Sequence, residues 1–214
     1  MAQLTIHTLA ARVAADIPGT FSHKSLIGLR GFTSAVRGGY LNPSANQSSF
    51  YVESFICPLY VPATTVYFNI GNRVPFARDP LRFMWSLDEG SFQSLSGAMR
   101  REVLPLLGIE EDFSAVVRLA GTLANSADPW VRLGVACSYM RMDRFSDGVS
   151  ELRTLRSDMN NNIAWQQQII AYIDAVMIHY GQSLADLEQF FTRCEMETCA
   201  ALGLSNYRIP PPRV

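Results

Sequence analysis

The chain has few of the side chains that enzymes commonly use for catalysis or metal binding. Its 214 residues include only three histidines, and no G-x-S-x-G, Walker-type, G-x-G-x-x-G or H-E-x-x-H pattern occurs. His7, His23 and His179 are far apart in sequence, so we interpret each as structural. The common hydrolase, nucleotide-binding and zinc-protease classes therefore lack their signatures, and we expect neither a cofactor nor a metal ion.

Cysteines are also few, and they lack the spacing of metal or redox sites. The closest two of the four, Cys194 and Cys199, are wider apart than a C-x-x-C pair, and Cys57 and Cys137 are isolated. Cys137 belongs to an apolar helical pattern, where a thiol behaves as a small hydrophobic group. We expect four reduced thiols that bind no metal.

Lysine is almost absent, because Lys24 is the only one among 18 basic residues. These 18 face 19 acidic residues, and a net charge of -1 provides no field that would attract nucleic acid or an anionic membrane. Residues 1–80 carry six basic and three acidic side chains, which leaves +3 there and -4 in the remainder. This asymmetry favours an oriented partner or docking of the two parts on each other, although a small imbalance often has no role.

Long apolar runs are missing as well. No apolar segment reaches the roughly 18 residues that a membrane span needs. The first residues do not combine a basic start, an apolar run and a small-residue cleavage site. We therefore expect a cytoplasmic protein without a membrane segment.

The first 90 residues change from helical to strand periodicity. Apolar residues at helical spacing from Ile6 to Ile17, with Thr5 as a cap, predict a helix over 5–17. A short helix is expected near 22–29. Period-two alternation and turn residues then predict antiparallel strands over 32–41, 50–57, 64–73 and 81–87.

Helical patterns follow Gly90. Ser91 and Asp128 are candidate N-caps, and Gly181 and Gly203 are candidate C-terminal caps. Pro105 and Gly108 are expected to end the first of these helices. The predicted helices cover 91–103, 113–123, 129–140, 145–155, 163–180 and 183–202.

One helical pair has a recognisable spacing. Trp130 and Gly134, followed by Phe145 and Gly148, resemble a single degenerate tetratricopeptide unit over 128–162. No second unit is visible, and a stable stack usually needs at least three. We interpret the segment as a helical hairpin and assign no family.

The predicted fold class is α+β, with an N-terminal helix and small antiparallel β-sheet followed by a C-terminal array of antiparallel α-helices. Residues 1–90 form the helix and sheet region. Residues 91–204 form the helical array, packed on the sheet as one compact unit. Residues 205–214 form an extended tail that contains three consecutive prolines.

Several conspicuous residues have simple structural interpretations. Glu110 to Asp112 complement the positive end of a helix, and Glu195 and Glu197 are read as solvated charges. Gly38 and Gly39 do not open a helix, so a bulge or hairpin is expected instead of a phosphate loop. The tryptophans expected in the core are Trp85, Trp130 and Trp165.

The most informative pattern lies on the predicted strands. Alternation places an acidic and an aromatic side chain on one face of 50–57, and aromatic, amide and arginine side chains on one face of 64–73. If these faces coincide, they have the composition of an interface. A simpler interpretation is that Glu53 pairs with Arg37 or Arg73 across the sheet. The candidate partner-binding residues are Tyr51, Glu53, Tyr67, Asn69, Arg73 and Arg37.

The leading hypothesis is a non-catalytic cytoplasmic protein-binding module, of inhibitor or immunity type. We expect a protein partner and no nucleic acid. The partner can also be a second copy of this chain, in a homo-oligomer. The alternative is a small-molecule enzyme or ligand-binding protein with a pocket between sheet and helices, anchored by Glu53 with Arg37 or Arg73. A flat exposed patch would favour the first hypothesis. A buried Glu53 beside a concave pocket would favour the second.

Overall fold

The computed structural model describes residues 4–46, 48–64, 70–75, 83–106, 112–123 and 125–209. It confirms the α+β class, because one helix and an antiparallel sheet of six strands precede the remaining helices. The first helix, α1, is Ile6–Asp16. The strands are β1 (Thr20–His23), β2 (Leu26–Leu29), β3 (Ala35–Pro43), β4 (Ser49–Pro58), β5 (Gly71–Val74) and β6 (Met84–Ser86).

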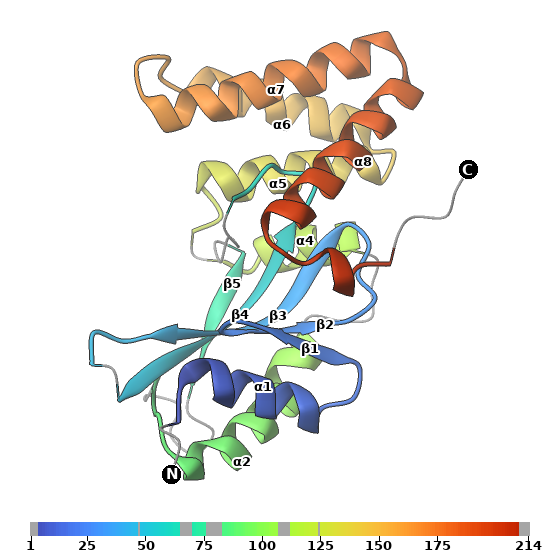
Figure 1. Cartoon of the computed structure of the whole chain (residues 1–214). Coiled ribbons are helices and arrows are strands. Elements are labelled where there is room, and N and C mark those ends of the chain that lie inside the picture. Colours follow the sequence, from blue (N-terminus) through green and yellow to red (C-terminus); the bar gives the residue numbers. More distant parts are fainter. Residues whose placement is uncertain are drawn as a thin grey trace.

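The helices after the sheet follow one another with short connections. They are α2 (Glu89–Ala98), a π-helical turn (Met99–Val103), α3 (Leu104–Leu106), α4 (Asp112–Ala120), α5 (Pro129–Arg141), α6 (Phe145–Asp158), α7 (Ala164–Gln182) and α8 (Leu184–Ala201). A 3-10 helix, Ser205–Tyr207, follows α8. Figure 1 shows the sheet in the middle of the molecule, with α1 and α2 below it and α5 to α8 above it.

The helix predicted over 5–17 is confirmed to within one residue at each end. The Thr5 hydroxyl accepts a hydrogen bond from the Thr8 backbone N–H at 3.1 Å, and the Thr8 side chain in turn caps the Thr5 N–H. The buried face of α1, which includes Leu9 and Val13, packs against the sheet.

The short helix expected near 22–29 is wrong, because this segment forms the β1–β2 hairpin. His23 pairs with Leu26, so the turn contains only Lys24 and Ser25, and Lys24 adopts a φ of 53°. Two four-residue strands are too short to show a period, and the turn lacks the Asn-Gly signal that usually marks a two-residue hairpin. Pairing of β2 with β3 decides the conformation.

Gly38 and Gly39 lie inside β3, not in a bulge or hairpin. A Cβ on Gly38 would lie 2.0 Å from the Ile27 carbonyl oxygen, and one on Gly39 would lie 2.7 Å from the Met99 sulfur. These glycines therefore allow close approach of β2 and of the π-helical turn to the middle of the sheet.

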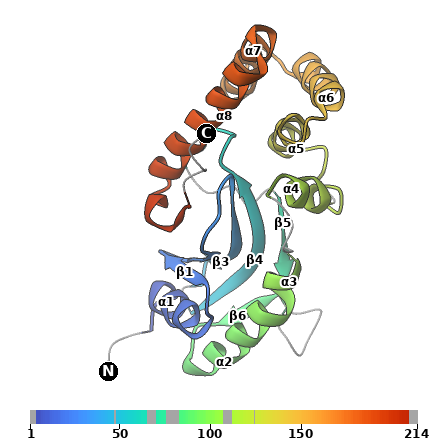
Figure 2. The same cartoon turned by 90° about the vertical axis from the view of Figure 1, so that its right-hand side faces the viewer.

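The two faces of the sheet are covered by different helices. On one face, Leu41, Phe50 and Val52 pack with residues of α1, α2 and α4. On the other, Phe55 and Cys57 pack with Leu202 and its neighbours after α8. A third core cluster places Tyr60 and Val61 among α5 to α8. Figure 2 shows α8 and the α2–α4 segments on opposite sides of the sheet.

The helical array follows its predicted cap residues closely. The Asp128 carboxylate accepts from the N–H groups of Trp130 and Val131, and the Ser183 hydroxyl accepts from that of Asp186. Consecutive helices from α4 to α8 pack on one another. Gly148 lets α6 approach α5, since a Cβ there would lie 2.4 Å from Met140 Cγ.

Other local expectations need correction. Asp88, not Ser91, caps α2, and the helical segment continues past Pro105 to Leu106 through the π-helical turn. Gly108 lies outside the described residues. Gly181 lies inside α7 and does not terminate it, whereas Gly203 has a φ of 71° after α8.

The tail and the tryptophans also differ in part from expectation. Residues 205–207 are helical instead of extended, and residues 210–214 lie outside the described part. Trp85 is fully buried and Trp130 is half-buried, but Trp165 on α7 is exposed. Of the strand expected over 64–73, Gly71, Asn72 and Arg73 lie in β5, whereas Thr64 and Ile70 are not in a strand and residues 65–69 lie outside the described part.

Candidate functional site

The strand register decides which of the candidate residues share a face. Glu53 on β4 is directly opposite Tyr40 on β3 and Arg73 on β5. Tyr51 is opposite Asn42 on β3 and Met84 on β6. Directly opposed residues point to the same side of a sheet, so these side chains form one surface. Tyr67 and Asn69 lie outside the described residues.

Contacts on this surface hold the Arg73 side chain over its neighbours. Arg73 Nε lies 3.4 Å from Glu53 Oε1, and its guanidinium carbon lies 4.4 Å from the centre of the Tyr51 ring. Asn42 Nδ2 also donates to Glu53 Oε1, at 3.2 Å. The Arg73 side chain is still 54% exposed, whereas that of Glu53 is 15% exposed. The other N–H groups of the Arg73 guanidinium are therefore exposed to solvent, while Tyr51 and Glu53 hold the side chain in place.

We call this surface the open sheet face. The other half of the same side of the sheet, which includes Phe55 and Cys57, is covered by the segment after α8. On the open half, Met84 is 44% exposed and Tyr51 is partly exposed. The open sheet face consists of Tyr40, Asn42, Tyr51, Glu53, Arg73 and Met84.

Arg37, the sixth candidate, belongs to the opposite side of the sheet. It is paired in register with Ile56, which packs in the α1 and α2 core. Its Nη2 lies 3.0 Å from Asp112 Oδ1, and both side chains are largely buried. Glu53 therefore pairs with Arg73 and not with Arg37, and Arg37 cannot contribute to the open sheet face.

Asp112 connects the start of α4 to the segment that leads into β3. Its Oδ2 accepts hydrogen bonds from Thr33 Oγ1 at 3.0 Å, from Ser34 N at 2.7 Å and from Ala35 N at 2.9 Å. A carboxylate with this many donors is a tertiary anchor. The interpretation of residues 110–112 as helix-end charges misses this role of Asp112.

Glu195 is the second buried acid that sequence reasoning misplaces as a solvated charge. It is 1% exposed and lies 3.3 Å from Arg141 and 2.7 Å from Arg208. Burial raises the pKa of Glu195, although the two arginines oppose this change. Arg208 Nε also donates to the Thr33 carbonyl at 2.7 Å. We call Arg37, Asp112, Arg141, Glu195 and Arg208 the interior ion network.

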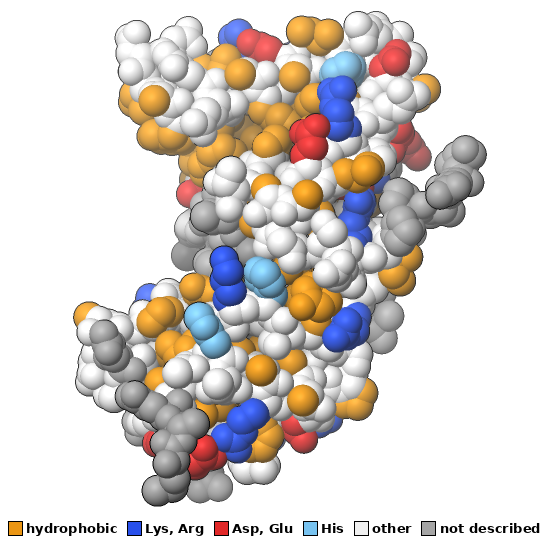
Figure 3. All heavy atoms as spheres, in the orientation of Figure 1, with side chains coloured by type: hydrophobic (Ala, Val, Ile, Leu, Met, Phe, Trp, Pro, Cys, Tyr) orange, Lys and Arg blue, Asp and Glu red, His pale blue; other side chains and the backbone are white. Residues whose placement is uncertain are grey.

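A hollow of 410 Å³ lies at the β1–β2 turn, between the sheet and the C-terminal end of α8. It brings together His7, His23, Lys24 and Tyr40, and a second hollow of 460 Å³ adjoins it at His7. Figure 3 shows histidine and basic side chains gathered on this face, with no acidic side chain among them. No sequence motif could indicate this group, because the hairpin and α8 bring its members together.

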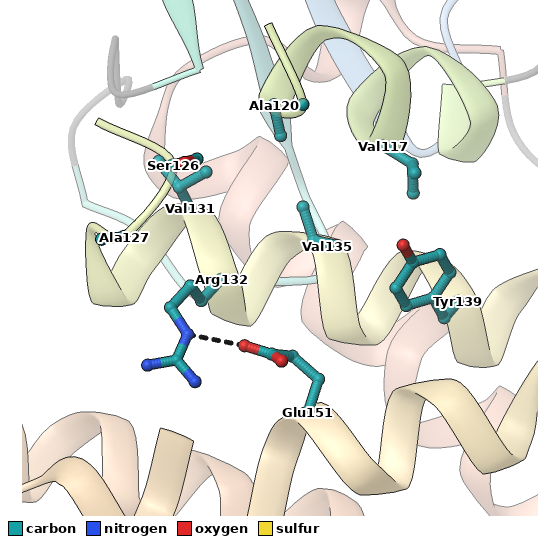
Figure 4. A pocket seen from close by; sticks show the side chains of 10 residues that line it. Val117, Ala120, Ser126, Ala127, Val131, Arg132, Val135, Tyr139 and Glu151 are labelled. Carbon is teal, nitrogen blue, oxygen red and sulfur yellow. Dashed lines mark hydrogen bonds and ion pairs between the residues drawn. The ribbon is translucent and has the colours of Figure 1, made fainter. Parts of the chain in front are cut away.

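A third hollow, of 420 Å³, lies between α4, α5 and α6. Its walls include Val117, Val131 and Val135, and Figure 4 shows Arg132 and Glu151 at its edge. Arg132 Nε lies 2.6 Å from Glu151, and Arg132 Nη1 lies 2.7 Å from Asp158. The charged groups of this hollow therefore neutralise one another.

The cysteines are buried thiols. All four are buried and unbridged. Burial raises the pKa of Cys194 to about 11 and that of Cys137 further. Thiolate is the nucleophilic form, so Cys137 and Cys194 carry the less reactive thiol form at neutral pH.

Within the described ranges, no three His, Cys, Asp or Glu residues are grouped so that they could hold a metal ion. The helices of the same part of the chain are all too short or too polar to cross a bilayer. No family model, no curated protein and no solved structure matches this chain.

Proposed function

We propose that the protein is a cytoplasmic, non-catalytic protein-binding module, of inhibitor or immunity type, whose partner docks on the open sheet face. The observation that carries this proposal is that, among the described residues, no helix covers this half of the sheet, which displays Tyr51, Arg73 and Met84. Tyrosine, arginine and methionine are enriched at protein interfaces.

The geometry of Arg73 fits an interface anchor. The Tyr51 ring and the Glu53 carboxylate already restrict its side chain, so less conformational entropy is lost on binding. A guanidinium can hold a carboxylate with two parallel hydrogen bonds. We therefore expect the partner to place an acidic side chain against Arg73 and an apolar side chain against Tyr51 and Met84.

The shape of this surface favours a protein over a small molecule. None of the hollows described above is lined by Tyr51, Glu53 or Arg73. A small ligand usually binds in a concave site that buries most of its surface. Of the anchors that the alternative hypothesis names, Arg37 lies on the opposite side of the sheet from Glu53, whereas Arg73 pairs with Glu53 on the open sheet face.

A partner-capture experiment with matched variants tests the proposal. Wild-type protein, Arg73→Ala, Tyr51→Ala and the control Arg153→Ala are used to capture partners from the native host. Arg153 is an exposed arginine on α6. We expect one stoichiometric protein that the wild type and Arg153→Ala retain, while Arg73→Ala and Tyr51→Ala weaken its binding by about 1–2 kcal/mol.

Two outcomes of this experiment would contradict the proposal. If folded Arg73→Ala and Tyr51→Ala bind the captured protein as tightly as the wild type, the open sheet face is not the docking surface. If only a metabolite co-purifies, the alternative function replaces the module.

A further inference from the structure

The hollow at the β1–β2 turn has a one-sided charge. The ionisable side chains that line it are His7, His23, Lys24 and Tyr40, and no carboxylate from the described residues lines it. Three of these four side chains can carry a positive charge. The other residues that line the hollow are Ser25 and Thr64, which carry hydroxyl groups, and residues with apolar side chains.

These basic groups differ from most of the arginines in the molecule. Between described residues, ion pairs with carboxylates are formed by nine arginines: Arg12, Arg37, Arg73, Arg100, Arg132, Arg141, Arg144, Arg156 and Arg208. In the described part of the chain, His7, His23 and Lys24 have no such partner. Neighbouring positive groups without a counter-ion repel one another, and an anion placed among them would remove that repulsion.

The hollow is built by rigid elements. The hairpin pairing fixes His23, and Gly203 after α8 packs so closely on its ring that a Cβ would lie 3.1 Å from His23 Cε1. Lys24 is held in the left-handed region of backbone space, which non-glycine residues rarely adopt. Such conformations are concentrated at binding sites.

The walls of the hollow have two kinds of chemistry. Lys24 and the two histidines lie at the turn and at α1, while Leu26, Pro43, Ala201 and Leu202 supply apolar surface. A ligand that fits both must combine an anionic group with an apolar body.

We propose that this hollow binds a small molecule that carries a phosphate or carboxylate group, with Lys24, His7 and His23 contacting the anion and Leu26 and Leu202 contacting its apolar part. The site goes beyond the docking function proposed above. It is distinct from the open sheet face, which it meets only at Tyr40.

Proton uptake should accompany binding. Burial, and to a smaller extent Lys24, lowers the pKa of His23 in the empty hollow. The other ionisable groups at the hollow are His7 on α1 and Tyr40 on β3, whose pKa is raised by burial and by Glu53. A bound anion favours the protonated form of His23, so binding tightens as the pH falls.

Titration calorimetry of the full chain at constant ionic strength tests the site. The probes are inorganic phosphate, phenyl phosphate and benzoate. We expect phenyl phosphate to bind at least about tenfold tighter than inorganic phosphate, because the apolar walls contact its ring. Comparison of phenyl phosphate with benzoate shows which anion the site prefers.

Variants locate the binding. Lys24→Asn removes the charge, and asparagine tolerates the left-handed backbone at this position. We expect it to weaken phenyl phosphate binding at least about tenfold, while the control Arg153→Asn changes it less than twofold. His23→Gln should reduce the tightening of benzoate binding between pH 8 and pH 6, a range over which benzoate keeps its charge.

Two results would overturn the proposal. One is the absence of saturable binding of all three probes up to about 10 mM, which corresponds to a negligible affinity. The other is an equal effect of Lys24→Asn and Arg153→Asn in variants whose circular dichroism spectra match that of the wild type. Neither result bears on the open sheet face, so the two proposals fail independently.

Discussion

The interior ion network and the Glu53–Arg73 pair use the same residue types in opposite ways. Asp112 and Glu195 are buried with their arginines, whereas the Arg73 side chain is more than half exposed. Removing one member of a buried pair leaves an uncompensated charge, but water replaces the partner of an exposed one. The first group therefore holds the sheet and the helical array together, and the second is available to a partner.

The location of the network supports this distinction. Residues 33–37 at the start of β3 contact Asp112 on α4, Arg141 on α5 and Arg208 beyond α8. Four segments that are distant in sequence thus meet at one end of the sheet. The Glu53–Arg73 pair joins only two neighbouring strands.

The largest expected effect is that of Asp112→Ala. It removes the acceptor of three hydrogen bonds and leaves Arg37 buried without its carboxylate. We expect the free energy of unfolding to fall by about 3–5 kcal/mol in urea denaturation. The control Asp147→Ala breaks an exposed pair with Arg144 and should cost no more than about 0.5 kcal/mol. Equal losses would show that burial does not separate the two classes of pair.

A smaller loss is expected for Arg208→Ala. Glu195 keeps Arg141 as a partner, but it loses the 2.7 Å contact with Arg208, and the Thr33 carbonyl loses its donor. We expect a loss of about 1.5–3 kcal/mol, measured by the same method. Arg156→Ala, which breaks an exposed pair with Asp174, is the matched variant and should cost less than about 1 kcal/mol.

Arg73→Ala should affect stability less than Arg208→Ala does. The Arg73 side chain is 54% exposed, and Glu53 keeps the hydrogen bond from Asn42 when Arg73 is removed. We expect a change within about 1 kcal/mol in thermal unfolding, together with the loss of partner binding described above. A large fall in melting temperature would instead assign Arg73 to the structural core.

The pH dependence of stability distinguishes Glu195 from exposed acids. Its pKa is raised by burial from an ordinary value of 4.5, so the folded protein binds this proton more tightly than the unfolded chain does. Its contribution to stability is fully present below 4.5 and is lost as the pH rises through the raised value. The stability of the wild type relative to Glu195→Gln should therefore fall as the pH rises from 4.5 through the raised pKa. A rise would mean that the two arginines outweigh burial.

Periodicity and cap residues account for what the sequence could predict of the fold. Asp128 and Ser183 start helices where expected, and β4 differs from its predicted range by one residue at each end. The β1–β2 hairpin was missed because its strands are short and its turn contains Lys24 and Ser25. In segments this short, pairing with β3 and not the local sequence determines the conformation.

The candidate site was predictable only within single strands. Alternation placed Tyr51 and Glu53 on one face, but the register that joins them to Arg73 is a tertiary property. Arg37 was misplaced for the same reason. Asp112 is buried by contacts with residues 33–37, which lie at least 75 positions earlier in the chain, and Glu195 by contacts with Arg141 on α5 and Arg208 after α8. No local pattern carries that information.

Two double-mutant cycles, measured by urea unfolding, test the central claim most directly. One combines Arg37→Ala with Asp112→Ala, and the other combines Glu53→Ala with Arg73→Ala. We predict a coupling free energy below about 1 kcal/mol for Glu53 with Arg73, and a clearly larger one for Arg37 with Asp112. Similar coupling energies for the two pairs, or a larger one for Glu53 with Arg73, would contradict the central claim. That claim is that the Arg37–Asp112 pair holds the fold together and the Glu53–Arg73 pair is available to a partner.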